Sequence, residues 1–199
     1  MPPSDDQPPL SRIASTQAAL RPDLAGLSVP GLLEAQARAR GDALALSAMS
    51  GSGVRQRLSY AALNAAARQS AAVLQRRGLT AGNRLGIFLT NDCALECFLA
   101  ALGALTLGAV AVPLNTRYAQ DDLHHAIGLT GPRLIVADAD GQAQLSRSLG
   151  SDAPAVLDAD AVTADPPPVP ADEIRDLPDL DSLACLLFTS GTTARAKAV

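Results

Sequence analysis

Short apolar runs alternate with helix-like segments between residues 84 and 137. The runs at 85–89, 110–112 and 134–137 are apolar or glycine at successive positions, which is typical of strands buried on both faces. The segments 92–107 and 120–129 between them have the length of helices. Because parallel strands are joined by crossover helices, this alternation predicts an α/β fold with a mostly parallel sheet flanked by helices.

Capping residues and helix breakers place further elements around this region. Ser59 precedes an apolar stripe and Gly78 follows it, so a helix is predicted from about residue 60 to residue 77. Pro30 and Gly41 bound another predicted helix in the same way. The remaining predicted elements are a helix at 142–149 and strands at 43–47, 54–58, 156–157 and 183–188.

The composition is that of a globular chain with a substantial core. Of 199 residues, 48% are hydrophobic and only 3% aromatic, the net charge is −4, and no basic block is present, so nucleic-acid binding is not expected. We expect a disordered segment over residues 1–27 and one partial domain over residues 28–199. Residues 151–182 carry nine acidic residues against one arginine, with several prolines, and predict a surface loop within that domain.

The amino terminus and the cysteines indicate a cytoplasmic protein. Residues 1–10 contain acidic residues and prolines, and they lack the basic start and apolar run of a signal peptide. Cys93, Cys97 and Cys185 are odd in number and lie in apolar surroundings. This pattern favours reduced thiols packed in the core over a disulfide framework or a metal site.

The segment 97–114 contains no charged residue and is long enough for a membrane-spanning helix to be considered. Gly103, Gly108 and Pro113 interrupt it, and the run at 110–112 near its end is short and contains two β-branched valines. We therefore favour a buried helix that turns at Gly108 into a buried strand, so that no membrane span is expected. A membrane-anchored protein is the alternative.

A hydroxyl-rich segment follows the last apolar run, and a lysine closes it. Its residues are Thr189, Ser190, Gly191, Thr192, Thr193 and Lys197. Backbone N–H groups and hydroxyls can donate hydrogen bonds to phosphate oxygens, while an ammonium supplies the countercharge. Because ligands bind at the carboxyl ends of parallel strands, the position of this segment after residues 183–188 predicts a phosphate-binding loop. Its spacing is not that of a Walker loop.

This loop resembles the phosphate-binding signature of the AMP-forming acyl- and aryl-acid ligases, the adenylate-forming superfamily. Residues 57–64 resemble an early strand-to-helix step of that family, and residues 108–118 resemble its second core segment. The three stretches occur in the family's order, and the resemblance spans about residues 29–199. It implies the amino-terminal part of the family's large domain, truncated at residue 199.

The resemblance also implies a two-step reaction. In the family, a carboxylate attacks the α-phosphate of ATP to give an acyl-adenylate and pyrophosphate, and a thiol, usually of coenzyme A, then takes the acyl group. The loop would hold the β- and γ-phosphates and Lys197 would neutralise the departing pyrophosphate. The implied cofactors are ATP, Mg²⁺ and coenzyme A, and the implied substrate is a small carboxylic acid. The family's catalytic residues and magnesium ligands lie downstream, so none is expected within this chain, and no partner protein is identifiable.

Two alternatives to the function of an acyl-CoA ligase remain. Residues 113–118 resemble acyl-CoA synthetases more than peptide-synthetase adenylation domains, which tend to have aspartate where Asn115 stands. A fragment of an amino-acid-activating adenylation domain is therefore the first alternative, and a truncated, non-catalytic remnant is the second. Ala194, Ala196 and Ala198 stand where the family has glycine, proline and glycine. We expect the 199-residue chain alone to be inactive.

Overall fold

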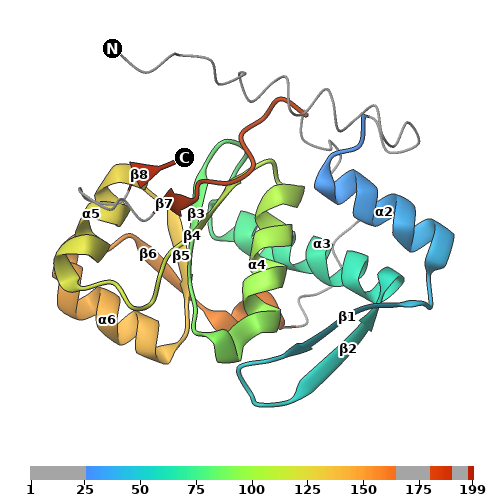
Figure 1. The fold of residues 1–199 in the computed structure, drawn as a ribbon, viewed down its shortest axis with the longest axis horizontal. Helices are drawn as coiled ribbons and strands as arrows, with labels where there is room; N and C mark the ends of the chain where they lie inside the picture. The colour runs from blue at the N-terminus through green and yellow to red at the C-terminus, as the bar shows by residue number, and fades with distance from the viewer. Residues whose placement is uncertain (1–25, 165–179, 190–196) are drawn as a thin grey trace, which may run out of the picture.

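The computed structural model describes residues 26–164, 180–189 and 197–199 (Figure 1). The segment 1–27, predicted to be disordered, lies almost wholly outside the described residues.

A four-stranded parallel sheet forms the centre of the structure (Figure 1). In spatial order its strands are β4 (Val110–Pro113), β3 (Arg84–Phe88), β5 (Leu134–Ala137) and β6 (Ala155–Asp158). Every neighbouring pair in this sheet is parallel. The predicted α/β fold with a parallel sheet is therefore confirmed.

Helices cover both faces of this sheet, as crossover connections require. One face packs against α3 (Tyr60–Arg76) and α4 (Ala94–Thr106), and the other packs against α5 (Gln120–Thr130) and α6 (Ala139–Leu149). All four helices agree with the predicted segments to within a few residues.

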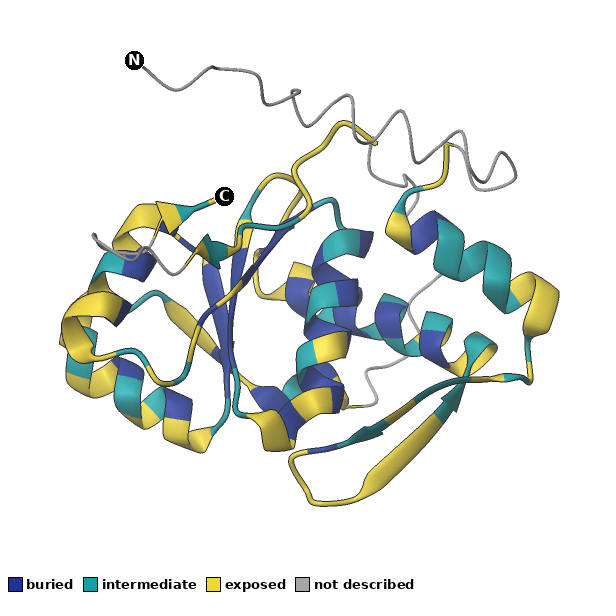
Figure 2. Ribbon diagram, viewed as in Figure 1, coloured by how far each residue is buried: buried dark blue, intermediate teal, exposed yellow. Residues whose placement is uncertain are grey.

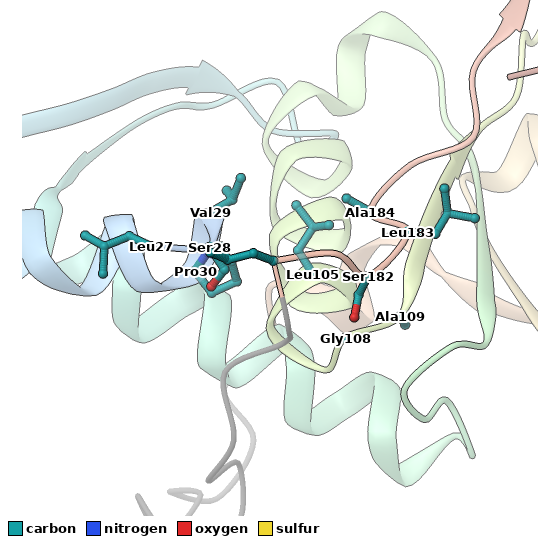
Figure 3. Close-up of a pocket in the computed structure, with 11 residues that line it drawn as sticks. Leu27, Ser28, Val29, Pro30, Leu105, Gly108, Ala109, Ser182, Leu183 and Ala184 are labelled. Atoms are coloured by element: carbon teal, nitrogen blue, oxygen red, sulfur yellow. The ribbon is translucent and has the colours of Figure 1, made fainter. Parts of the chain in front are cut away.

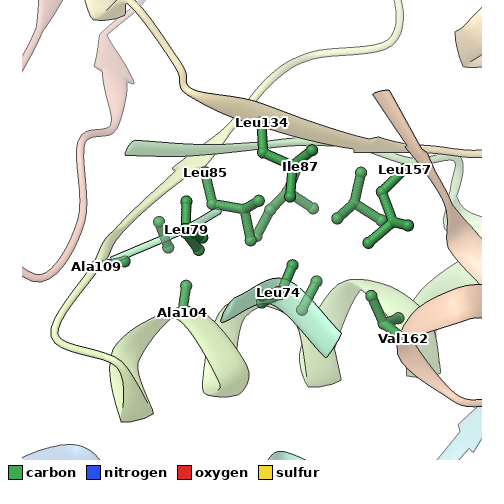
Figure 4. Packing of buried hydrophobic residues seen from close by; sticks show 12 residues of the cluster. Leu74, Leu79, Leu85, Ile87, Ala104, Ala109, Leu134, Leu157 and Val162 are labelled. Atoms are coloured by element: carbon green, nitrogen blue, oxygen red, sulfur yellow. The ribbon is translucent and has the colours of Figure 1, made fainter. Parts of the chain in front are cut away.

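Successive residues of the central strands face opposite sides of the sheet, as the β pleat requires. Leu85 and Leu134 pack with the α3 and α4 side, where Leu74 of α3 meets them (Figure 4). Phe88 and Ile135 pack with the α5 and α6 side. Since both faces are covered, the central strands are buried along most of their length (Figure 2), which explains their nearly continuous apolar sequence.

An antiparallel hairpin connects the first described helix to α3. It follows α2 (Val29–Arg40) and consists of β1 (Leu44–Met49) and β2 (Arg55–Ser59). The hydroxyl of Ser59 accepts a hydrogen bond from the backbone N–H of Ala62 at 3.2 Å, so Ser59 caps α3 as its sequence position predicts. A third apolar cluster packs the hairpin against α3 and α4.

The charge-free segment 97–114 forms most of α4 and all of β4, with a turn at Gly108 where φ is +68°. Within the described part of the chain, no helix combines the length and apolar character needed to cross a membrane. The helix predicted at 92–107 is preceded by a separate 3₁₀ turn, η2 (Asn91–Cys93), because the backbone of Cys93 leaves the helical region before α4 begins.

The acidic range 151–182 contains sheet and core structure as well as connecting residues. The 3₁₀ helices η3 (Gly150–Asp152) and η4 (Ala159–Val162) lie on either side of β6. Leu157 and Val162 are 3% and 1% exposed, and they belong to the core between the sheet and the helices α3 and α4. The surface loop predicted for this range therefore does not include residues 155–162. Residues 165–179 lie outside the described part.

Candidate phosphate-binding site

An extended segment lies beside β4 at the edge of the parallel sheet. The N–H of Ala111 donates to the carbonyl of Ala184 at 2.9 Å, and the N–H of Leu186 donates to the carbonyl of Ala111 at 3.0 Å. These bonds form a single parallel bridge between Ala111 and Cys185. The strand predicted at 183–188 therefore pairs with β4 only around Cys185. The next β4 residue that would donate to this segment is Pro113, which has no backbone N–H.

Leu187 exchanges hydrogen bonds with Val199, at 2.8 Å in each direction. This pair leads into a short antiparallel hairpin made of β7 (Phe188–Thr189) and β8 (Lys197–Ala198). The hairpin continues from the carboxyl end of the edge segment, which is the edge at which parallel sheets bind ligands.

Thr189 and Lys197 are directly opposite one another in this hairpin. The Thr189 hydroxyl donates to the Lys197 carbonyl at 3.4 Å, and both residues are exposed. Of the six residues predicted to bind phosphate, the structure brings these two together at the carboxyl edge of the sheet. The other four, Ser190, Gly191, Thr192 and Thr193, lie outside the described residues.

The turn after β4 forms a wall next to the hairpin. The N–H of Tyr118 donates to the carbonyl of Asn115 at 3.1 Å, and the side-chain oxygen of Asn115 accepts from the N–H of Arg117 at 3.0 Å. A cavity of about 480 Å³ lies between this turn and residues 187–189. Tyr118, which is expected from its sequence position to fix this loop and to have no catalytic role, lines the cavity together with Phe188, and the two rings meet edge to face.

Asp138 joins two loops at the same edge of the sheet. Its Oδ1 accepts the N–H of Gly141 at 2.8 Å and thereby caps α6. Its Oδ2 accepts both the N–H and the hydroxyl of Thr90, at 3.0 and 2.7 Å. Sequence reasoning missed this residue, although an aspartate directly after an apolar strand is a recognisable helix-capping signal.

The surroundings of Asp138 shift the pKa values of two groups, the Asp138 carboxyl and the Cys93 thiol. Burial acts to raise the pKa of the Asp138 carboxyl, but hydrogen bonds from Thr90, Gly141 and Cys93 outweigh burial and hold that pKa below its usual value. Burial and the nearby Asp138 carboxylate raise the pKa of the Cys93 thiol to about 11. Cys93 is therefore a protonated thiol at neutral pH, and its Sγ lies 3.7 Å from Asp138 Oδ2 as a donor.

The described residues contain no cluster of three or more His, Cys, Asp or Glu side chains that could hold a metal ion. Cys93, Cys97 and Cys185 all carry free thiols, and Cys93 is buried. The described hairpin residues Thr189 and Lys197 carry a hydroxyl donor and an ammonium group, which suit phosphate oxygens.

A different cavity, of about 240 Å³, lies between the start of α2 and residues 180–184 (Figure 3). Most of its lining is apolar, including Leu27, Leu105 and Leu183, and Ser28 and Ser182 are its polar lining residues. This lining includes no cationic side chain, so the cavity does not offer the chemistry that phosphate binding needs.

Comparison with known proteins identifies relatives among ligases and synthases. The chain is 29% identical over 160 residues to the long-chain-fatty-acid–CoA ligase FadD13 of Mycobacterium tuberculosis, covering 72% of this chain and 29% of that ligase. It is 30% identical over 148 residues to gramicidin S synthase 2 of Brevibacillus brevis, covering 73% of this chain and 3% of the synthase. This chain therefore spans less than a third of either relative.

The fold is shared with O-succinylbenzoate coenzyme A synthetase of Bacillus subtilis, which was solved in complex with ATP and a magnesium ion. The TM-score is 0.66 at 20% sequence identity, over 84% of this chain and 41% of the synthetase. Residues 33–199 match the family described as AMP-binding enzymes. The chain belongs to this family, and the predicted resemblance to adenylate-forming ligases is confirmed.

Proposed function

We propose that this chain supplies the phosphate-binding part of an ATP-dependent ligase that converts a carboxylic acid to its acyl-adenylate and then to an acyl-CoA thioester. The observation that carries the proposal is the pairing of Thr189 with Lys197 at the carboxyl edge of the parallel sheet. That pairing lies within the segment that matches the AMP-binding enzyme family.

The residues of this chain would hold the part of ATP that leaves as pyrophosphate. The Thr189 hydroxyl would turn from the Lys197 carbonyl to donate to a phosphate oxygen. Ser190, Gly191, Thr192 and Thr193 would add further donors. Lys197 would offset the negative charge that grows on pyrophosphate as the bond to the α-phosphate breaks. Mg²⁺ would supply further charge neutralisation when bound, and coenzyme A would supply the accepting thiol.

A coenzyme A ligase is favoured over an amino-acid-activating domain by the turn after β4. Asn115 stands at a position where adenylation domains tend to have aspartate, and its side chain accepts from Arg117 within the turn. Release of a CoA thioester from a fatty or aromatic acid, and not of an aminoacyl-adenylate, by a protein that contains this chain would support the proposal. Activation of amino acids alone would contradict it.

Changing Lys197 to Ala is expected to weaken pyrophosphate binding about tenfold. A hydrogen bond to a charged group contributes roughly 1.5–3 kcal/mol, and tenfold corresponds to about 1.4 kcal/mol. Isothermal titration calorimetry of the 199-residue chain with pyrophosphate measures the change. Arg38→Ala is the matched control, because Arg38 is an exposed cation bound to Glu34 at 3.0 Å, away from the hairpin. Equal affinities for wild type and Lys197→Ala would remove Lys197 from the site.

The 199-residue chain alone is expected to show no acid-dependent exchange between ATP and pyrophosphate. Catalysis requires the acid and ATP to be held in line, and the described residues offer phosphate contacts without a metal-binding cluster. Exchange assayed with fatty and aromatic acids should stay at the level of a protein-free control. Robust exchange would show that this part of the fold holds both reactants by itself.

A further inference from the structure

The hairpin that carries Thr189 and Lys197 continues beyond the last backbone hydrogen bond between its strand and the sheet. The N–H of Leu186 is the final group of this segment that bonds to β4, through the carbonyl of Ala111 at 3.0 Å. The next residue, Leu187, bonds only within the hairpin, to Val199. The position of β7 relative to the sheet therefore depends on side-chain contacts and on the packing of β8 beside α5.

An aromatic pair supplies such a contact at the base of the hairpin. The ring centroids of Tyr118 and Phe188 are 6.1 Å apart, and the ring planes meet at 85°. This edge-to-face geometry is the favourable one for aromatic rings. Both rings are half-buried and pack against the apolar cluster on the α5 and α6 side of the sheet. Since Phe188 directly precedes Thr189, its position determines where the Thr189 hydroxyl lies.

Tyr118 is itself fixed from two sides. Its N–H donates to the carbonyl of Asn115 at 3.1 Å, which closes the turn after β4. Its carbonyl accepts from Nε2 of Gln144, on α6, at 3.0 Å. The ring therefore extends from a backbone that is bonded within the turn after β4 and to a helix, and it can support the more weakly attached hairpin.

We propose that Tyr118 is a positioning residue for the phosphate-binding hairpin, acting through its ring on Phe188. This inference rests on the proposed function for the identity of the ligand, but the contact itself is independent of it. A shift of Phe188 on the scale of 1 Å would misplace Thr189 relative to a phosphate oxygen. Because the ring makes the contact, phenylalanine at position 118 should preserve it.

Amide hydrogen exchange of the 199-residue chain, followed by NMR, tests the contact without any ligand. In Tyr118→Ala, the amides of Leu187 and Val199 should exchange at least about tenfold faster, because local opening of the hairpin becomes easier. Amides of β5 should keep their wild-type rates, and Tyr118→Phe should restore protection of the hairpin. The control is Tyr60→Ala, which removes the ring that lies under Arg40 at the start of α3. This variant should leave the exchange of the Leu187 and Val199 amides unchanged.

Pyrophosphate affinity provides the second measurement. Tyr118→Ala should lower the affinity at least about fivefold, and Tyr118→Phe should stay within about twofold of wild type. Unchanged exchange of Leu187 and Val199 in Tyr118→Ala would overturn the inference, and so would equally faster exchange throughout β5, which indicates a general loss of stability. If wild type itself fails to bind pyrophosphate, the proposed function is wrong, and the exchange rates still decide whether Tyr118 positions the hairpin.

Discussion

Asp138→Ala is expected to destabilise the fold by roughly 2–4 kcal/mol, the largest effect of the substitutions considered. The change removes the cap of α6, for which about 1 kcal/mol is typical. It also removes two hydrogen bonds in which Thr90 donates to a carboxylate, and leaves these donors without their partner. Urea unfolding followed by circular dichroism measures the loss. Asp140→Ala, at an exposed position in the first turn of the same helix, is the matched control and should change stability by no more than about 0.5 kcal/mol.

The cost of Asp138→Ala should depend on pH. The pKa of Asp138 is lowered in the folded state, so its stabilising contribution is fully present above the unfolded pKa of about 3.9 and is lost as pH falls through the folded pKa. Wild type and Asp138→Ala should therefore differ most at neutral pH and approach one another in strong acid. A difference in stability that stays constant from pH 7 to pH 2 would contradict the role of the charged carboxylate.

Gly103→Ala is expected to destabilise the chain by about 2 kcal/mol, although alanine is the better helix former. A Cβ at Gly103 would lie 2.5 Å from the Ser70 hydroxyl and 2.9 Å from the backbone nitrogen of Ala71. Overpacking of this kind costs up to about 3 kcal/mol, and the gain in helix propensity of about 1 kcal/mol offsets only part of it. The cause is the close contact of α3 with α4, since the backbone of Ala71 cannot move aside without separating the two helices.

Gly128→Ala is the matched control for this contact. Gly128 is an exposed residue of α5, and a Cβ there would meet no atom within 4 Å. The same substitution should therefore stabilise the chain by about 0.5–1 kcal/mol through helix propensity alone. Thermal unfolding of the two variants should shift in opposite directions, and a stabilising shift in Gly103→Ala would show that the contact of α3 with α4 is looser than described.

Local patterns predicted most elements of this fold. The strand predicted at 134–137 is observed as β5 with the same bounds, because four successive apolar residues are followed by a capping aspartate. The helix that begins at Tyr60 was predicted because Ser59 offers a capping hydroxyl next to an apolar stripe. Both signals act over a few residues and need no knowledge of what the element packs against.

Element boundaries were missed where a residue has a long-range role. The helix predicted from residue 142 begins at Ala139, because Asp138 caps it. The helix start was placed too late because Gly141 lies in its first turn and glycine is a poor helix former. Its lack of a side chain is required instead by tertiary packing, because a Cβ there would lie 2.8 Å from the carbonyl oxygen of Phe88.

The candidate site likewise combines features that local sequence predicts with contacts that only the folded chain makes. The motif alone predicted Thr189 and Lys197 as phosphate ligands, and the structure places the two residues opposite one another. The motif did not reveal the contacts of Tyr118 with Phe188 or of Asp138 with Thr90, because these partners are distant in sequence. Thr90, for example, is 48 residues away from Asp138.

The sequence by itself determined the α/β class, the type and approximate extent of nearly every element, and the side-chain chemistry of residues 189–197. These properties follow from hydrophobic periodicity, capping residues and side-chain chemistry, all of which are local. Only the tertiary structure decided the strand order β4–β3–β5–β6 and which loops meet at the carboxyl edge of the sheet. The physical reason is that strand pairing depends on how helices from distant parts of the chain pack on both faces, and no local periodicity encodes that choice.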